Sequence, residues 1–262
     1  MSDTVATRIE RREYKYVVDV ATAERVRRAI TPFCKLDRFC LGRPGHRYTI
    51  DSLYLDTPGR SLFYAGIEQR TERFKLRVRG YGPGSPVFVE EKRRVNDVIV
   101  KARGRVGADW ARLFEDPATP LPSTGHPAED AAVARVVLLA RTYHALPAML
   151  VRYDREAYES TVDPYTRISF DTRVCSQPAE RYSLACAETG WRAVDDAVAM
   201  RAHVSSVVLE LKFGSSCIPT WLVRIVRRLD LQREAFSKYN SSVIAWHGRF
   251  QCGARSATSR VA

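Results

Sequence analysis

The feature that most restricts the fold of this sequence is a strict alternation of charged and apolar residues from Arg73 to Arg79. Alternate residues of a β-strand point to opposite faces of its sheet. A strand here would therefore separate four basic residues from three apolar ones: Arg73, Lys75, Arg77 and Arg79 from Phe74, Leu76 and Val78. The pattern predicts a half-buried strand of an antiparallel sheet.

Two further strand-like segments follow directly, Val87–Arg94 and Val98–Val106. The first connection, residues 80–86, is rich in Gly and Pro, and the second is the pair Asn96-Asp97; both are typical of turns. The three segments are therefore predicted to form a β-meander. The second and third strands add charged residues to one face: Glu90, Lys92, Arg94, Lys101, Arg103 and Arg105.

Basic faces on three adjacent strands have two interpretations. They are either the solvated side of an antiparallel sheet, or the lining of an interior that holds an anion. Like charges directly opposite each other destabilise a sheet unless something offsets them, and an anionic ligand would do so. We therefore expect the sheet to close into a barrel with a wet, cationic interior and apolar outer faces packed against helices.

The rest of the chain adds strands and amphipathic helices. Strands are predicted at Ile9–Val18, Tyr48–Leu55, Met149–Tyr158, Arg167–Val174 and Ser206–Phe213, and helices at Thr22–Ile30, Glu129–His144, Thr220–Leu229 and from Ser61. The fold class is α+β, a closed antiparallel β-barrel with flanking helices. We interpret residues 1–262 as one domain, with 116–127 as a surface loop and a disordered tail after about residue 249.

The formal net charge of +12 and the pI of about 9.7 predict an anionic partner. The basic strand faces show no interleaved aromatic residues for base stacking, which disfavours nucleic acid. No apolar segment is long enough to span a membrane. The six cysteines match neither a disulfide framework nor a zinc motif, so we expect a cytoplasmic protein with reduced thiols.

Six short motifs occur along the chain: Arg12–Tyr16 (REYKY), Ser52–Asp56 (SLYLD), Lys75–Arg79 (KLRVR), Glu90–Lys92 (EEK), Leu209–Lys212 (LELK) and Phe236–Tyr239 (FSKY). Their order resembles the catalytic domain of the vacuolar transporter chaperone (VTC) polyphosphate polymerases. That domain belongs to the triphosphate tunnel metalloenzymes, the CYTH-like superfamily. The resemblance runs from about residue 9 to 246 and depends on the combination, since no single motif is specific.

The resemblance implies a tunnel lined by cations that bind phosphate. The residues implied to be catalytic are Lys15, Arg77, Arg79 and Lys92, and those implied to bind substrate phosphates are Lys101, Arg152, Arg167, Ser237 and Lys238. Glu210 is implied to bind a divalent metal, Mn²⁺ or Mg²⁺, with Glu90 as a second candidate. From the residue pattern alone, a salt bridge is the better interpretation of Glu210, and Ser237 suits a helix N-cap equally well.

Two positions depart from the family pattern. Arg11 replaces the first acid of the Glu-x-Glu-x-Lys motif that is frequent in the wider superfamily, and this fits the polymerase branch better than the triphosphatase branch. Glu234 and Ala235 stand where a second lysine is expected just upstream of Ser237. The second departure affects the end of the expected tunnel.

The expected substrates are ATP, inorganic triphosphate and polyphosphate. We expect the chain to transfer the γ-phosphate of ATP to a growing polyphosphate, because an anionic phosphate nucleophile needs cations rather than a general base. Hydrolysis of triphosphate or polyphosphate, with water oriented by Glu13 or Glu90, is the alternative activity. A non-catalytic module that binds polyphosphate or RNA is the third hypothesis.

Overall fold

The computed structural model describes residues 11–96, 98–185, 189–200, 203–214 and 218–248. The tail that the sequence predicts to be disordered, after about residue 249, lies outside these ranges. No helix in the described ranges combines the length and the apolar character needed to cross a membrane.

Strands dominate the described part of the chain. They are β1 (Arg11–Asp19), β2 (Cys34–Leu36), β3 (Tyr48–Asp56), β4 (Glu72–Gly80), β5 (Val87–Val95), β6 (Val98–Val106), β7 (Leu146–Ser160), β8 (Arg167–Pro178), β9 (Arg192–Ala193) and β10 (Ser206–Gly214). The helices are α1 (Val20–Ile30), η1 (Pro44–His46), α2 (Ser61–Ile67), α3 (Arg112–Glu115), α4 (Pro127–Thr142), α5 (Ala197–Met200), α6 (Thr220–Arg228) and α7 (Lys238–His247).

All strands join one antiparallel sheet in the order β2-β7-β3-β4-β5-β6-β1-β10-β8-β9. The sheet curves strongly, because β7 also pairs with β8 along most of its length. β1 and β6, however, meet at a single residue pair, Arg11 with Ile99. The fold is thus an α+β antiparallel sheet with flanking helices, and the closed barrel expected from the sequence is not established, because the hydrogen bonds do not close the sheet.

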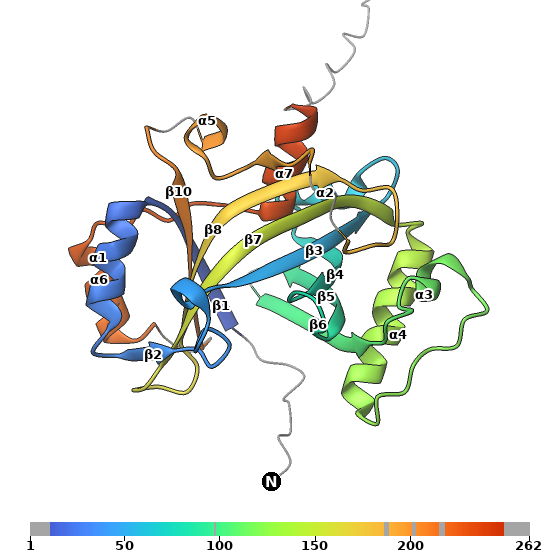
Figure 1. The fold of residues 1–262 in the computed structure, drawn as a ribbon, viewed down its shortest axis with the longest axis horizontal. Helices are drawn as coiled ribbons and strands as arrows, with labels where there is room; N and C mark the ends of the chain where they lie inside the picture. Colours follow the sequence, from blue (N-terminus) through green and yellow to red (C-terminus); the bar gives the residue numbers. More distant parts are fainter. Residues whose placement is uncertain (1–10, 97, 186–188, 201–202, 215–217, 249–262) are drawn as a thin grey trace, which may run out of the picture.

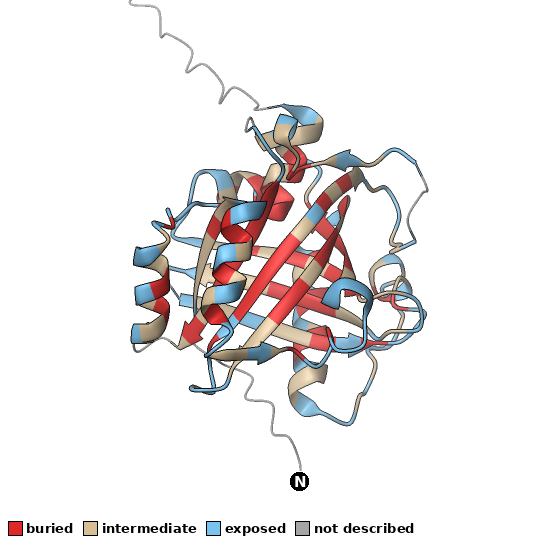
Figure 2. Ribbon diagram, turned by 60° about the vertical axis from the view of Figure 1, so that its left-hand side comes forward, coloured by how far each residue is buried: buried red, intermediate tan, exposed pale blue. Residues whose placement is uncertain are grey.

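Helices cover the outer, apolar face of the sheet at two places (Figure 1). α3 and α4 pack on β4, β5 and β6 through residues such as Leu76, Val89 and Val136. α1 and α6 lie side by side over β1, β8 and β10, where Leu209 and Phe213 are buried. Figure 2 shows that α1 and α6 carry their exposed residues on the side turned away from the sheet. The apolar half of the predicted alternation therefore forms the two outer cores.

A third apolar cluster lies beneath α7, where Tyr239 stacks on Tyr54 of β3 with ring centroids 4.9 Å apart. The buried Asp56 fixes this arrangement. Its carboxylate accepts hydrogen bonds from the first turns of α2, at the amides of Leu62 and Phe63, and from the Tyr239 hydroxyl at 2.6 Å. α7 is thereby held against β3, with its amino terminus turned toward the sheet interior.

The close packing of α4 on β6 depends on Gly104. A Cβ atom at this position would lie 2.4 Å from the Glu129 carbonyl oxygen and 2.5 Å from a methyl of Val133. We expect Gly104→Ala to lower the free energy of unfolding by about 1–3 kcal/mol through overpacking. Gly107→Ala is the control, because nothing lies within 4 Å of its added Cβ. Urea denaturation of both variants checks the prediction, and equal stabilities would contradict it.

Candidate active site

The inner face of the sheet carries a row of three lysines. Lys75 on β4 lies opposite Lys92 on β5, which lies opposite Lys101 on β6. The next row on the same face places Arg77 opposite Glu90. Directly opposed like charges destabilise a sheet, so the row of lysines needs anions nearby.

Two of the three lysines have carboxylate partners. Lys92 contacts Glu13 on β1 at 2.9 Å, and Lys101 contacts Glu90 at 2.8 Å. Burial would raise the pKa of Glu13, but Lys92, Lys15 and Lys212 together hold the pKa below its ordinary value. Burial lowers the pKa values of the two lysines as well, that of Lys101 to about 7, although Glu90 and Glu13 oppose this effect.

Lys75 is bound differently from the other two. Its ammonium donates hydrogen bonds to the side-chain oxygens of Ser237 and Asn240, at the amino terminus of α7. Burial lowers the pKa of Lys75 well below its ordinary value, and the charges of Lys15 and Lys92 lower it further. An anion bound near Lys75 would therefore favour its charged form.

Glu90 is completely buried and sits among four basic side chains. Arg77 donates to it at 2.6 Å, Arg103 lies at 3.4 Å and Arg79 at 3.8 Å, in addition to Lys101. Burial opposes ionisation, yet Arg77, Lys101 and Arg79 hold the pKa of Glu90 well below its ordinary value. Glu90 acts in this arrangement as a shared counter-ion for strands β4 to β6.

A second buried carboxylate, Glu210 on β10, is also shared by four cations. Lys212 lies at 2.8 Å, Arg155 at 3.3 Å, Lys238 at 3.4 Å and Lys15 at 3.5 Å. Desolvation would raise the pKa of Glu210, but Lys212 and Lys238 hold it well below its ordinary value. This carboxylate ties β1, β7 and β10 to α7.

Asp171 on β8 completes the set of inner carboxylates. It receives two hydrogen bonds of 2.7 Å from Arg155, and the ammonium of Lys238 lies 2.5 Å away. We call this network the inner cluster. It consists of ten basic residues, Lys15, Lys75, Arg77, Arg79, Lys92, Lys101, Arg103, Arg155, Lys212 and Lys238, and four acidic ones, Glu13, Glu90, Asp171 and Glu210.

Most of the residues proposed from the sequence come together in the inner cluster: Lys15, Arg77, Arg79, Lys92, Lys101, Lys238, Glu210 and Glu90. Ser237 adjoins it through Lys75 and also caps α7, since its hydroxyl accepts from the Asn240 amide. Arg167 lies at the start of β8, half exposed and paired with Glu159. Their roles as substrate ligands remain predictions.

Arg152 lies on the other face of the sheet. It pairs with Asp51 at 2.7 Å and stacks over Trp191, and its strand neighbour Leu150 belongs to the outer core beneath α4. Arg155, which belongs to the other set of alternate residues of β7, lies in the interior instead. The sequence correctly grouped alternate residues of this strand, but it gave no sign of which group faces inward.

A divalent metal in the inner cluster would need some of its ligands from the substrate. Within the described ranges, no three metal-binding side chains of the Asp, Glu, His and Cys types gather at one point. Mg²⁺ is commonly held by one or two carboxylates together with substrate phosphates, and Glu210 fits this mode, with Glu13 on the neighbouring strand sharing Lys15 as a partner. The enclosed Glu90 fits the part of a counter-ion better.

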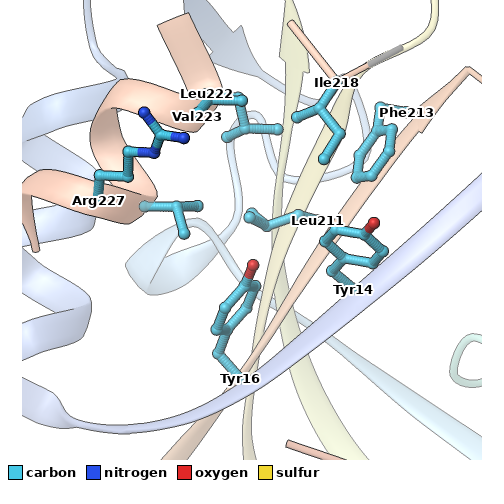
Figure 3. A pocket seen from close by; sticks show the side chains of 9 residues that line it. Tyr14, Tyr16, Leu211, Phe213, Ile218, Leu222, Val223 and Arg227 are labelled. Carbon is cyan, nitrogen blue, oxygen red and sulfur yellow. The ribbon is translucent and has the colours of Figure 1, made fainter. Parts of the chain in front are cut away.

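A separate apolar cavity of about 130 Å³ lies between the outer face of β1 and β10 and helix α6 (Figure 3). Tyr16, Leu211 and Leu222 line it, and Arg227 is the charged residue among the described residues of its lining. The cavity lies on the outer face and its lining is mainly apolar, so it is not part of the inner cluster.

Lys75 and Lys92 have different environments, so we predict opposite effects on protein stability when each is replaced. Lys75→Gln keeps a hydrogen-bond donor for Ser237 and Asn240 but removes a buried ionisable group whose pKa is lowered in the folded state, so it should stabilise the ligand-free protein at pH 7. The gain should shrink as the pH rises toward about 10.4, where the lysine of the unfolded chain also loses its proton.

Lys92→Gln is the matched change, and it should lower stability because it removes the closest partner of Glu13. Thermal unfolding of both variants at several pH values provides the measurement. If both changes destabilise the protein equally, Lys75 is not the uncompensated member of the row.

One family model and several solved structures are similar to this chain. The family model of the VTC domain matches residues 10–247. No curated protein matches the chain. Among solved structures, HpAC1 from Hippeastrum, described as having a dominant triphosphatase activity, is similar with 13% identity and a TM-score of 0.48 over 89% of this chain and 95% of that one. PH1819 from Pyrococcus horikoshii is similar with 13% identity and a TM-score of 0.45 over 88% and 96%. Nothing about the chemistry of this chain follows from the two structures.

Proposed function

Because the chain belongs to the VTC domain family, we propose that the inner cluster binds a chain of phosphates and transfers the γ-phosphate of ATP to a growing polyphosphate. The observation that carries the proposal is the excess of ten basic over four acidic side chains in one interior. Such an excess suits a ligand with several negative charges. In the bound state the sheet would surround the phosphates as a tunnel, with the edges of β1 and β6 drawn together.

The cluster offers the two things that phosphoryl transfer needs, positioning and neutralisation of charge. The guanidinium groups of Arg77 and Arg79 can each bind a phosphate through two hydrogen bonds. Lys92 and Lys101 add compact charges on the same face. These cations would hold the ATP phosphates in line with the terminal phosphate of the acceptor chain, whose oxygen attacks and whose addition releases ADP.

We favour transfer to phosphate over hydrolysis because of the surroundings of two acidic residues. Water would need a carboxylate to orient it and accept its proton, and the sequence offered Glu13 and Glu90 for this part. Both are held by basic neighbours that lower their pKa values, so both are weak bases. A phosphate oxygen is already anionic and needs no base. Hydrolysis of triphosphate remains the alternative, and pure binding of polyphosphate or RNA is the third possibility.

The products of one incubation separate these functions. The purified protein is supplied with ATP and Mn²⁺, with and without a short polyphosphate primer, and the products are resolved by length. We expect long-chain polyphosphate and ADP in equal phosphate equivalents. Free phosphate as the main product would establish hydrolysis instead, and unchanged ATP would leave only binding.

Arg79 and Arg93 provide a test of the inward face. Arg79 lies in the inner cluster, whereas Arg93 lies on the opposite face of β5, over Phe74 and paired with Glu91. Loss of a charge-assisted contact to phosphate costs roughly 1.5–3 kcal/mol. We therefore expect Arg79→Ala, like Arg77→Ala, to weaken tripolyphosphate binding at least about tenfold, and Arg93→Ala to change it less than twofold. Calorimetric titration measures all three, and equal losses would indicate a diffuse surface patch.

Glu210 provides a test of the metal. A bound Mn²⁺ or Mg²⁺ would neutralise charge on the transferred phosphate. We expect Glu210→Gln to abolish turnover with Mn²⁺ while tripolyphosphate binding in EDTA is kept, because the change makes the inner cluster more positive. Glu24→Gln, which removes the partner of the exposed Arg28 on the outer helix α1, should leave turnover near the wild-type rate. Normal turnover of Glu210→Gln would exclude this residue as a metal ligand.

A further inference from the structure

A group of aromatic rings continues the inner face beyond Arg79. Phe88 on β5 lies opposite Arg79 on one side and Arg105 on the other. The ring of Tyr81, just after β4, is 6.1 Å from Phe88, and the ring of Tyr48 at the start of β3 is 6.1 Å from Tyr81. We call these three residues, Tyr48, Tyr81 and Phe88, the aromatic cluster.

Arg103 connects the aromatic cluster to the inner cluster. Its guanidinium lies 3.6 Å from the centre of the Phe88 ring and 5.5 Å from that of Tyr81, and it donates to the Tyr81 hydroxyl at 3.2 Å. The same guanidinium is 3.4 Å from Glu90. One side chain therefore touches both the counter-ion of the phosphate-binding cations and the aromatic rings.

Packing of the protein core does not account for Phe88. The ring belongs to none of the three apolar clusters, and it is only partly buried. The other residues that share its face of β5 are Glu90, Lys92 and Arg94. Tyr48 and Tyr81 border the cluster beneath α7 but are likewise only partly buried. An apolar ring among cations, with part of its surface open to solvent, is suited to stacking against a ligand.

We propose that the aromatic cluster is a subsite for the base of a nucleoside triphosphate whose phosphates lie in the inner cluster. The inference rests on the proposed function. Nucleic-acid bases stack on aromatic rings and on guanidinium planes, and the cluster offers both side by side. The prediction that the basic faces carry no aromatic residue is wrong: Phe88 shares the face of Glu90 and Lys92, and the other two rings come from strand ends.

The spacing along the strands agrees with this assignment. Phe88 is two residues from Glu90 on the same face, a separation of about 6.8 Å along β5. A ribose joins the phosphates of a nucleotide to its base over a comparable length. Phosphates held by Arg77 and Arg79 would therefore bring the base to the rings of Phe88 and Tyr81.

The test compares ATP with inorganic tripolyphosphate, which has the phosphates but no base. In Phe88→Leu and in Tyr81→Leu, we expect the dissociation constant for ATP to rise about tenfold and that for tripolyphosphate to change less than twofold. Tyr143→Leu is the control, because Tyr143 contacts Phe74 on the outer face. Binding of tripolyphosphate also reports whether each variant is folded, and two independent variants guard against a defect in one of them.

The possible outcomes distinguish the inference from its premise. Equal weakening of ATP binding and tripolyphosphate binding would mean that the rings only position Arg103 beside Glu90. This result would overturn the base subsite and leave the phosphate site intact. Unchanged binding of both ligands in both variants would also overturn it. If the wild-type protein binds neither ligand, the proposed function fails and the subsite fails with it.

Discussion

Mutual repulsion of basic side chains in one interior is the constraint on which the rest of this structure depends. Three lysines stand directly opposite one another across β4, β5 and β6. Each acidic residue nearby is shared: Glu90 and Glu210 are each surrounded by four cations. Removal of one such carboxylate would expose several strands to repulsion at once, so these acids hold the interior together in the absence of ligand.

The outer face supplies the stability that the inner face lacks. The apolar half of each alternating strand packs beneath α4 on one side and beneath α1 and α6 on the other. Burial of these side chains contributes the large favourable term, roughly 25 cal/mol per Å² of apolar surface. The protein can therefore keep an interior in which basic side chains outnumber acidic ones. An anionic ligand would complete it, which connects the stability of the fold directly to binding.

The sequence predicted the parts that depend on local pattern. The meander of β4, β5 and β6 is found almost at the expected residues, because strict alternation and clear turn residues specify it. Arg152 shows the limit of such reasoning: alternation tells which residues share a face, but only the packing of Leu150 under α4 decides which face is outside. Arg155 was missed for the same reason. Lys75 was placed on the basic face but was given no role in the site, because its partners Ser237 and Asn240 are distant in the sequence.

The sequence suggested Ser237 as a helix N-cap but did not predict the extent of α7, because Lys238–His247 has no clear amphipathic pattern and is held instead by the Tyr239 contact to Asp56. The expected closure of the sheet depends on one contact between β1 and β6, which local sequence does not encode.

The most direct test of the account is the position of a bound phosphate chain. A crystal structure of the protein with tripolyphosphate would locate the three phosphorus atoms without reference to activity. The account predicts continuous density on the inner face, with phosphate oxygens within hydrogen-bond distance of Arg77, Lys92 and Lys101. Tripolyphosphate bound only to basic residues on the outer surface, with the inner ion pairs unchanged, would contradict it.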